Sequence, residues 1–287
     1  MRLGAAEEET EIAPAEYLAR LGNSGDGPHD IATAALMLAA LDHPEKKLAP
    51  FRAHLAELAQ AARAEVEFAR NAEAAARALG HVMAARYGYD GERIHFDDPA
   101  NANLMLVIER RRGLPVALGI LYIHAGRGAG VDARGLFAPG HFLLKIMHRS
   151  SEALIDPFNG GAVLDREHFT PSLGVPVLMG EPVQTDEPAP LEPVSDTDVL
   201  LRLQNNIRSR ALKNHDAARA IEIGRRMTLI APRRPALWLD LGRLQEASVA
   251  LSAARSAYVS CIQASRTGDA FHNEATLALE TLKRRIN

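Results

Sequence analysis

The sequence has one cysteine, one tryptophan and 5% aromatic residues among its 287 residues, and long apolar runs are missing. A single cysteine excludes a disulfide framework and a cysteine-based metal site, and it is typical of a reducing compartment. A membrane span needs about 18 consecutive apolar residues. The acidic N-terminus, MRLGAAEEETEIAP, also lacks the apolar segment of a secretory signal. We therefore expect a cytoplasmic protein that makes no membrane contact.

Composition and length indicate two globular domains joined by a linker. Hydrophobic residues make up 47% of the chain and charged residues 24%, as in ordinary globular proteins. Residues 181–196 contain four prolines and five acidic residues with almost nothing apolar, which is typical of an extended linker. We expect a disordered tail at residues 1–12, a first domain at 13–180 and a second at 197–287.

The stretch from residue 103 onward organises the first domain. Residues 103–112 are predicted to form a short helix that Gly113 ends, and residues 114–128 a helix that is apolar nearly all round and therefore buried. The pattern then alternates, which predicts strands near residues 142–146 and 153–155. With a helical cap supplied by the N-terminal third, the expected fold class is α+β.

His141 opens the first predicted strand, and Asp156 closes the second. A hairpin would bring them together, and a carboxylate beside a histidine orients the base in nucleophilic catalysis. The segments ERRRGLPVALGILY and PGHFLLKI…IDPFNGG resemble the transglutaminase-like superfamily and, within it, the bacterial SirB-type branch that carries a tetratricopeptide-repeat tail. The resemblance covers residues 12–287. It implies a papain-like core, a cysteine nucleophile at the start of the buried helix, and His141 and Asp156 as its partners facing that helix terminus.

The nucleophile position of the family falls on Pro115, and residues 113–119 contain no Cys, Ser or Thr. Thiol chemistry is therefore excluded at this position. Two charged residues lie just before it, and they have two interpretations. Glu109 and Arg112 either form a solvated charged face at a helix C-terminus or line a pocket beside Pro115.

The last 91 residues contain the spacing of a 34-residue helical repeat. Trp238, Leu241, Gly242, Ala254 and Tyr258 match the pattern W-x2-L-G…A-x3-aromatic of the tetratricopeptide repeat. An earlier copy lacks the tryptophan and the glycine, and a final helix would cap the array. The second domain is accordingly predicted to be an all-α tetratricopeptide-repeat module.

Charge divides the chain into two unlike parts. Residues 1–196 hold 18 basic and 28 acidic residues, and residues 197–287 hold 15 basic and 8 acidic, so their net charges are −10 and +7. Either the two parts dock on each other, or the basic repeats bind an acidic segment of a protein partner. Nucleic acid is the weaker option, because no nucleic-acid motif is present.

Two classes of function remain open at this point. The favoured one is a non-catalytic regulatory or adaptor protein that binds a protein partner. The alternative is a hydrolase or amidase in which His141 and Asp156 activate water. No cofactor is expected, and His141 with His148 lacks a third ligand at the spacing of a metal site.

Overall fold

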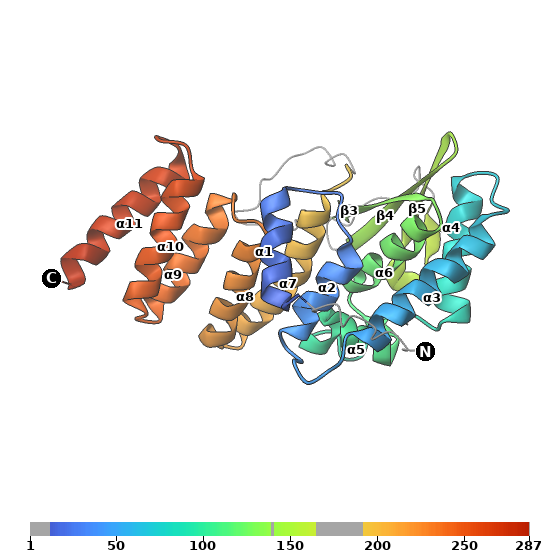
Figure 1. Cartoon of the computed structure of the whole chain (residues 1–287), viewed down its shortest axis with the longest axis horizontal. Helices are drawn as coiled ribbons and strands as arrows, with labels where there is room; N and C mark the ends of the chain where they lie inside the picture. The colour runs from blue at the N-terminus through green and yellow to red at the C-terminus, as the bar shows by residue number, and fades with distance from the viewer. Residues whose placement is uncertain (1–11, 139–140, 165–191, 287) are drawn as a thin grey trace, which may run out of the picture.

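The structure is a computed structural model that describes residues 12–138, 141–164 and 192–286 (Figure 1). Helices precede a small sheet, and a second set of helices follows it. The elements before the sheet are α1 (Pro14–Ser24), α2 (Ile31–Ala40), α3 (Ala49–Val66), α4 (Ala72–Gly80), the π-helical turn η1 (His81–Arg86), β1 (Asp90–Gly91), the 3-10 turn η2 (Pro99–Ala102), α5 (Leu104–Arg110), β2 (Arg112–Gly113) and α6 (Pro115–Gly128). The others are β3 (Asp132–Ala138), β4 (His141–His148), β5 (Ser151–Asp156), the 3-10 turn η3 (Pro157–Asn159), β6 (Ala162–Leu164), α7 (Asp196–Lys213), α8 (Ala217–Ile230), α9 (Pro235–Ala247), α10 (Leu251–Ala264) and α11 (Ala270–Ile286).

The sheet is a four-stranded antiparallel meander in the order β3-β4-β5-β6. Ala138 lies opposite His141 where β3 and β4 meet. A small antiparallel sheet among helices confirms the α+β expectation. The predicted strands near residues 142–146 and 153–155 are β4 and β5, whereas β6 is not among the strands predicted from the sequence. Residues 1–11 of the predicted tail also lie outside the described residues.

Helix α6 is the buried helix that its sequence predicts. Pro115 occupies the first helical position, where its missing N–H has no intrahelical partner to lose. Ten of the fourteen residues of α6 are buried. A Cβ added to Gly119 would lie 2.2 Å from Cε1 of Phe142, so the glycine allows the ring of β4 to rest directly on the helix.

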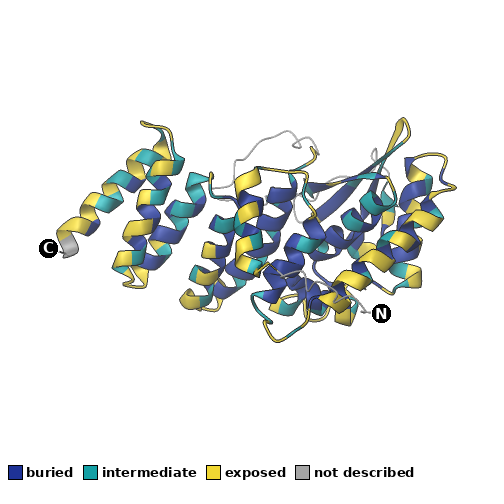
Figure 2. Cartoon of the chain, in the orientation of Figure 1, coloured by how far each residue is buried: buried dark blue, intermediate teal, exposed yellow. Residues whose placement is uncertain are grey.

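The two faces of the sheet belong to different apolar clusters. Phe142 and Leu144 of β4 join the main core with α6, whereas Leu143 packs with Leu136 and Leu154 in a separate cluster. This division follows from the alternation of side chains along a strand. Helix α4 packs against β4, β5 and β6, and Figure 2 shows the strands and α6 as largely buried.

The main core continues without a break into the helices that follow the sheet. Helix α1 packs along α8, where a Cβ on Gly22 would lie only 2.0 Å from the carbonyl oxygen of Leu229. Val199 of α7 lies 2.9 Å from the Cβ position of Gly135 in β3. The core therefore runs across the domain boundary predicted between residues 196 and 197.

The end of the predicted linker is part of the fold. The Val194 N–H donates to the carbonyl of Gly135 at 2.9 Å, which adds a short extension to the edge of the sheet. Asp196 is 5% exposed, and its carboxylate accepts two hydrogen bonds from Arg127 at 2.7 and 2.8 Å. The linker residues before 192 lie outside the described residues.

Ion pairs join the acidic and basic parts of the chain. Asp42, after α2, accepts hydrogen bonds from Arg219 and Arg226 of α8 at 2.8 and 2.6 Å. Arg226 is 4% exposed, so this contact is buried, whereas Asp97 pairs with Arg210 of α7 at the surface. Residues 197–234 contain nine basic and three acidic residues, which is +6 of the +7 counted for residues 197–287. Most of that positive charge therefore lies in the part that docks on the acidic N-terminal region.

Helices α9–α11 extend beyond the main core and have an apolar cluster of their own (Figure 1). A Cβ on Gly242 would lie 2.5 Å from the ring of Tyr258, and Trp238 Nε1 donates to the carbonyl of Pro232 at 2.8 Å. Ala254 is fully buried. These contacts explain the residue types at the repeat positions, and the assignment to the tetratricopeptide repeat stays a prediction.

Across the three described segments, no helix combines the length and the apolar character that crossing a membrane requires. The two 18-residue helices, α3 and α7, both carry charged side chains.

We expect Asp42→Asn to loosen the contact between α8 and the N-terminal helices. Removing one partner of a buried pair costs about 3–5 kcal/mol when the other charge is left alone. Because Arg226 keeps Glu222 as a second partner, the free energy of unfolding should fall by roughly 2–3 kcal/mol, below that range. Urea denaturation measures this loss.

The pH dependence and a matched variant test the same link. Burial favours a higher pKa for Asp42, but the hydrogen bonds from Arg219 and Arg226 outweigh it and lower the pKa below 3.8. The link therefore stabilises the fold above about pH 3.8 and is lost as the pH falls through the lowered pKa.

Asp97 is 74% exposed, so Asp97→Asn should change stability by less than about 1 kcal/mol. Equal losses for the two variants would contradict the argument.

Candidate functional site

The start of α6 contains no nucleophile. Pro115 is the first helical residue, and the N–H of Leu114 before it donates to the carbonyl of Asn101 at 2.9 Å. Cys261 lies in the separate cluster of α9–α11, fully buried, with its Sγ 3.7 Å from the carbonyl oxygen of Phe271. Burial raises the pKa of this thiol. Both the position and the pKa of Cys261 keep it out of any chemistry at Pro115.

His141 is the first residue of β4, and its side chain is exposed. Alternation along the strand places His141 on the face of Leu143, whereas Phe142 covers Gly119 of α6. The phenyl ring of Phe142 is thus the group that covers α6 at Gly119, and the expectation that His141 faces the start of this helix stays a prediction. A hydrogen bond between His141 and Asp156 stays a prediction.

Asp156 caps the turn that follows β5. Its side chain is 6% exposed. Oδ1 accepts from the N–H of Phe158 at 2.9 Å, and Oδ2 accepts from Nδ2 of Asn159 at 2.6 Å. Gly160 and Gly161, with φ of 63° and 73°, then turn the chain into β6. Both carboxylate oxygens are thus engaged in local structure.

Arg93 connects this turn to the segment before α6. Its guanidinium donates to the carboxylate of Asp90 at 2.9 Å and to Oδ1 of Asn159 at 3.0 Å, and it stacks on the ring of Phe158. Burial works against ionisation of Asp90, but hydrogen bonds led by the one from Arg93 lower its pKa. The hydrogen bonds run from Asp156 through Asn159 and Arg93 to Asp90, whose strand β1 pairs in parallel with β2. The sequence places Asp90 and Arg93 in a plain polar loop, and nothing in their spacing indicates this network.

Tyr122 of α6 lies behind the same turn. It is fully buried, and its hydroxyl has no hydrogen-bond partner among the residues described. A Cβ on Gly161 would lie 2.8 Å from this hydroxyl, so the backbone of the turn approaches it closely. Burial first, and then the charges of Asp90 and Asp156, raise the pKa of Tyr122. The phenol is therefore protonated and enclosed, which suits packing rather than acid–base exchange with substrate.

The two charged pocket candidates lie apart from this turn. Glu109 is 43% exposed and accepts a hydrogen bond from Lys46 Nζ at 2.7 Å. Exposed Arg112 donates to the carbonyl of Gly88 at 2.9 Å. Glu109 lines a surface hollow that neither Arg112 nor Pro115 lines. A pocket that is lined by Glu109, Arg112 and Pro115 together stays a prediction.

No group of three or more His, Cys, Asp or Glu side chains within residues 12–138, 141–164 and 192–286 is arranged to hold a metal ion.

Comparison with known proteins identifies the family of this architecture. The sequence pattern of the "Transglutaminase-like superfamily" matches residues 49–205, which reach from α3 into α7. A UPF0162 protein of Xylella fastidiosa is 28% identical over 216 residues, which cover 74% of this chain and 75% of the relative. A UPF0162 protein of Pseudomonas aeruginosa is 29% identical over 69% of this chain and 73% of its own length. The F-box only protein 21 of mouse is 28% identical over 82 residues, 29% of this chain and 13% of that protein. No solved structure matches the chain.

We expect Asp156→Ala to destabilise the fold by about 1–3 kcal/mol, because the Phe158 N–H and the Asn159 amide lose their acceptor. Asp156→Asn keeps one side-chain oxygen for the Phe158 N–H and should lose less. Thermal and urea unfolding of both variants measure the difference. Wild-type stability in Asp156→Ala would contradict the capping role.

Proposed function

The chain belongs to the transglutaminase-like superfamily, and on this basis we propose that it is a non-catalytic regulatory or adaptor protein that binds a protein partner. The observation that carries the proposal is Pro115 at the start of α6. Covalent catalysis in this fold requires an activated nucleophile there. Neither Pro115 nor any other residue from 113 to 119 has a thiol or a hydroxyl.

The competing function is a hydrolase or amidase that activates water through His141 and Asp156. In that role the carboxylate orients the imidazole, and the imidazole takes a proton from water. Both oxygens of Asp156 already accept hydrogen bonds within turn η3. These bonds give Asp156 a role in the turn that needs no catalysis, which supports the non-catalytic proposal.

Partner binding is assigned to α9–α11 as part of the proposal. We place the chain in the SirB-type branch, with these helices as tetratricopeptide repeats, whose stacked surfaces are the usual binding surfaces. The contact of Tyr258 with Gly242 and the buried Ala254 support that assignment. Because α7 and α8 share the main core and α9–α11 pack largely in a cluster of their own, we place the binding surface on α9–α11.

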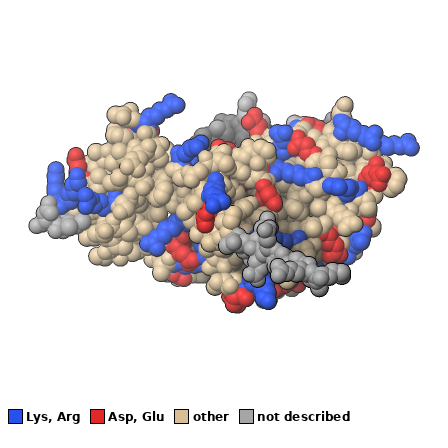
Figure 3. Space-filling view, viewed as in Figure 1, with Lys and Arg blue, Asp and Glu red and all other residues tan. Residues whose placement is uncertain are grey.

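The proposed partner presents an acidic segment with some apolar side chains. Leu277 and Phe271 of α11 are 65% and 39% exposed. Lys283 and Arg284, near the end of the same helix, are exposed and have no ion pair with a described residue. Figure 3 shows basic side chains gathered at this end of the molecule. The apolar residues would contact the partner, and the basic ones would select its charge.

The full chain should form no covalent acyl-enzyme when it is incubated with an amine donor and a glutamine peptide, because no thiol lies at the start of α6. Intact-mass measurement detects such an adduct. Cys261→Ser should leave any function of the protein unchanged. A mass increase that maps to residues 113–119 or to Cys261 would overturn the non-catalytic proposal.

Charge reversal on α11 should weaken partner binding at least tenfold. The test compares the wild type with the double variant Lys283→Glu/Arg284→Glu and with Leu277→Ser. All three are full-length chains, because α7 and α8 share the core with the N-terminal helices and an isolated C-terminal fragment would expose that core. A partner captured from extract of the source organism is then titrated at about 50 and 300 mM salt, because the higher salt shortens the screening length below the ~8 Å of physiological salt.

The matched control is Arg225→Glu, which reverses an exposed charge on α8. The affinity of this control for the partner and its decrease with salt should equal those of the wild type, because the α11 charges are unchanged. Equal affinities for the wild type and the two α11 variants would contradict the assignment of the binding surface to α11.

A further inference from the structure

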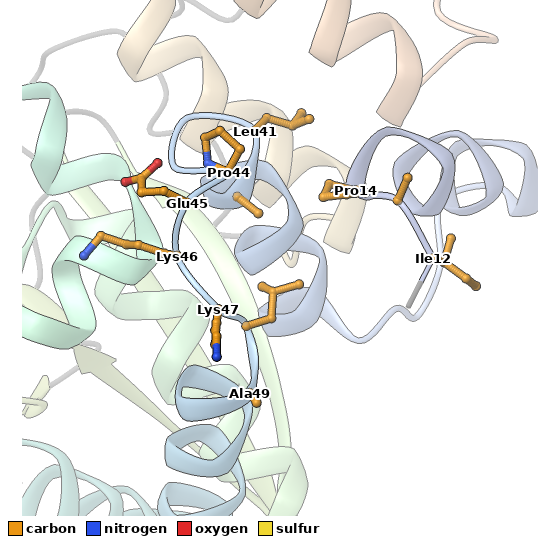
Figure 4. A pocket seen from close by; sticks show the side chains of 11 residues that line it. Ile12, Pro14, Leu41, Pro44, Glu45, Lys46, Lys47 and Ala49 are labelled. Carbon is orange, nitrogen blue, oxygen red and sulfur yellow. The ribbon is translucent and has the colours of Figure 1, made fainter. Parts of the chain in front are cut away.

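A surface hollow lies where the start of α3 meets the end of α5. Its volume is about 470 Å³, within the usual 300–1,000 Å³ of small-molecule sites. The hollow is lined by Lys46, Lys47, Pro50, Phe51, His54, Ile108, Glu109 and Arg111. A neighbouring pocket of about 660 Å³ shares the two lysines, and Figure 4 shows their ammonium groups turned away from Ile12 and Pro14 of that pocket.

Arg111 is placed in the hollow by an unusual backbone conformation. It follows the last residue of α5 with φ of 58° and ψ of 23°, the left-handed region that residues with a side chain seldom adopt. Its guanidinium lies 4.7 Å from the centre of the Tyr89 ring. Nη1 donates both to the hydroxyl of Tyr89 and to Nε2 of His54. Backbone, stacking and hydrogen bonds together fix the orientation of this cation.

A second layer of contacts holds the partners of Arg111. Nδ1 of His54 lies 3.6 Å from Glu57, which also accepts a hydrogen bond from the hydroxyl of Tyr87 at 2.8 Å. Burial and then the charge of Arg111 lower the pKa of His54, so its ring is neutral at pH 7 and Nε2 accepts. Burial raises the pKa of Tyr89, which stays a phenol. Arg111 is therefore a cation at the centre of this cluster of ordered side chains, with the carboxylate of Glu57 in the second layer.

The guanidinium has binding capacity left over. Nε and Nη2 form one edge of the group, and neither has a hydrogen-bond partner among the residues that the structure describes. No carboxylate of those residues forms an ion pair with Arg111. Lys47 is exposed and likewise has no ion pair within that part of the chain, whereas Lys46 is neutralised by Glu109. The hollow thus presents two uncompensated positive charges.

We propose that this hollow binds a small molecule that carries an oxyanion group. A carboxylate or phosphate fits the Nε–Nη2 edge, since a planar fork of two donors matches two oxygens. A second negative charge on the ligand would lie near Lys47, and Pro50, Phe51 and Ile108 would contact its carbon skeleton. Because Arg111 is held in place before binding, little ordering of the site is required. The proposal goes beyond partner binding and does not depend on it.

Isothermal titration of the full chain with three probes tests the proposal: succinate, glycerol 3-phosphate and inorganic phosphate. We expect saturable binding of succinate or glycerol 3-phosphate at about 1 mM or below, and weaker binding of inorganic phosphate, which has no carbon skeleton. Binding of succinate but not of glycerol 3-phosphate would indicate a carboxylate site, and the reverse result would indicate a phosphate site. Sodium chloride at equal ionic strength is the blank.

Four variants separate the geometry of the site from its charge. Arg111→Lys keeps the charge and loses the fork, and Arg111→Gln loses both; each should weaken binding at least tenfold. Lys47→Gln, on an exposed loop, should weaken it several-fold without disturbing the fold. Arg112→Gln changes the neighbouring exposed arginine outside the hollow and should bind as the wild type does. Circular dichroism confirms that each variant is folded.

Three outcomes would overturn the proposal. One is the absence of saturable heat for all three probes with the wild type. Another is unchanged affinity in both Arg111→Lys and Lys47→Gln. The third is tighter binding of an octaglutamate peptide than of any small probe, with that binding lost in Arg111→Lys. This result would make the hollow a docking site for an acidic protein segment.

Discussion

The close approach of β4 to helix α6 determines how the rest of the fold is arranged. Gly119 makes it possible, because the ring of Phe142 occupies the space that any side chain at that position would take. The same helix contacts α2, α3, β3 and α7, so the sheet and both sets of helices are positioned relative to it. The middle of α6 is therefore enclosed by packing, and the turn after β5 closes over Tyr122 on the same part of the helix. A larger residue at 119 would have to separate the sheet from the helix.

Charge acts within this molecule at short range. The net charges of the two parts of the chain suggest a long-range field, yet most of the positive charge of the second part lies in α7, α8 and the loop that follows. There Arg219 and Arg226 contact Asp42, and Arg210 contacts Asp97. A buried pair such as Asp42 with Arg226 fixes the register of two packed surfaces more than it adds to stability. The charge asymmetry thus largely reflects an internal interface.

The sequence predicts those features that depend on neighbours along the chain. Apolar residues on nearly all sides of residues 114–128 predict a buried helix, and the alternation of side-chain types around residue 142 predicts a strand. Both are found. The predicted end of the preceding helix, at Gly113, is wrong: α5 ends at Arg110, because Arg111 itself adopts the left-handed conformation usually left to glycine. Apolar periodicity identifies a face of α7 that must be covered, but it does not show that Gly135 of β3 and helix α2 lie beside that face. The shared core was therefore not predictable. His54, Tyr89 and Arg111 are each ordinary residues far apart in the sequence, and only the fold brings them together.

The identity of a residue and its role in the fold have to be separated when a catalytic pattern is incomplete. Asp156 is the residue predicted to correspond to the family's aspartate. Its two oxygens hold the turn between β5 and β6, a role that exists whether or not a nucleophile is present. Its presence is therefore explained without catalysis. A binding role is better indicated by polar groups that are held in place and still have unused capacity. By that criterion the start of α6 offers little, since the side chain of Pro115 has no polar atom and Arg93 and Asp90 satisfy each other. Arg111, ordered on three sides with one edge of its guanidinium unused, meets the criterion and lies outside the position that the family pattern marks.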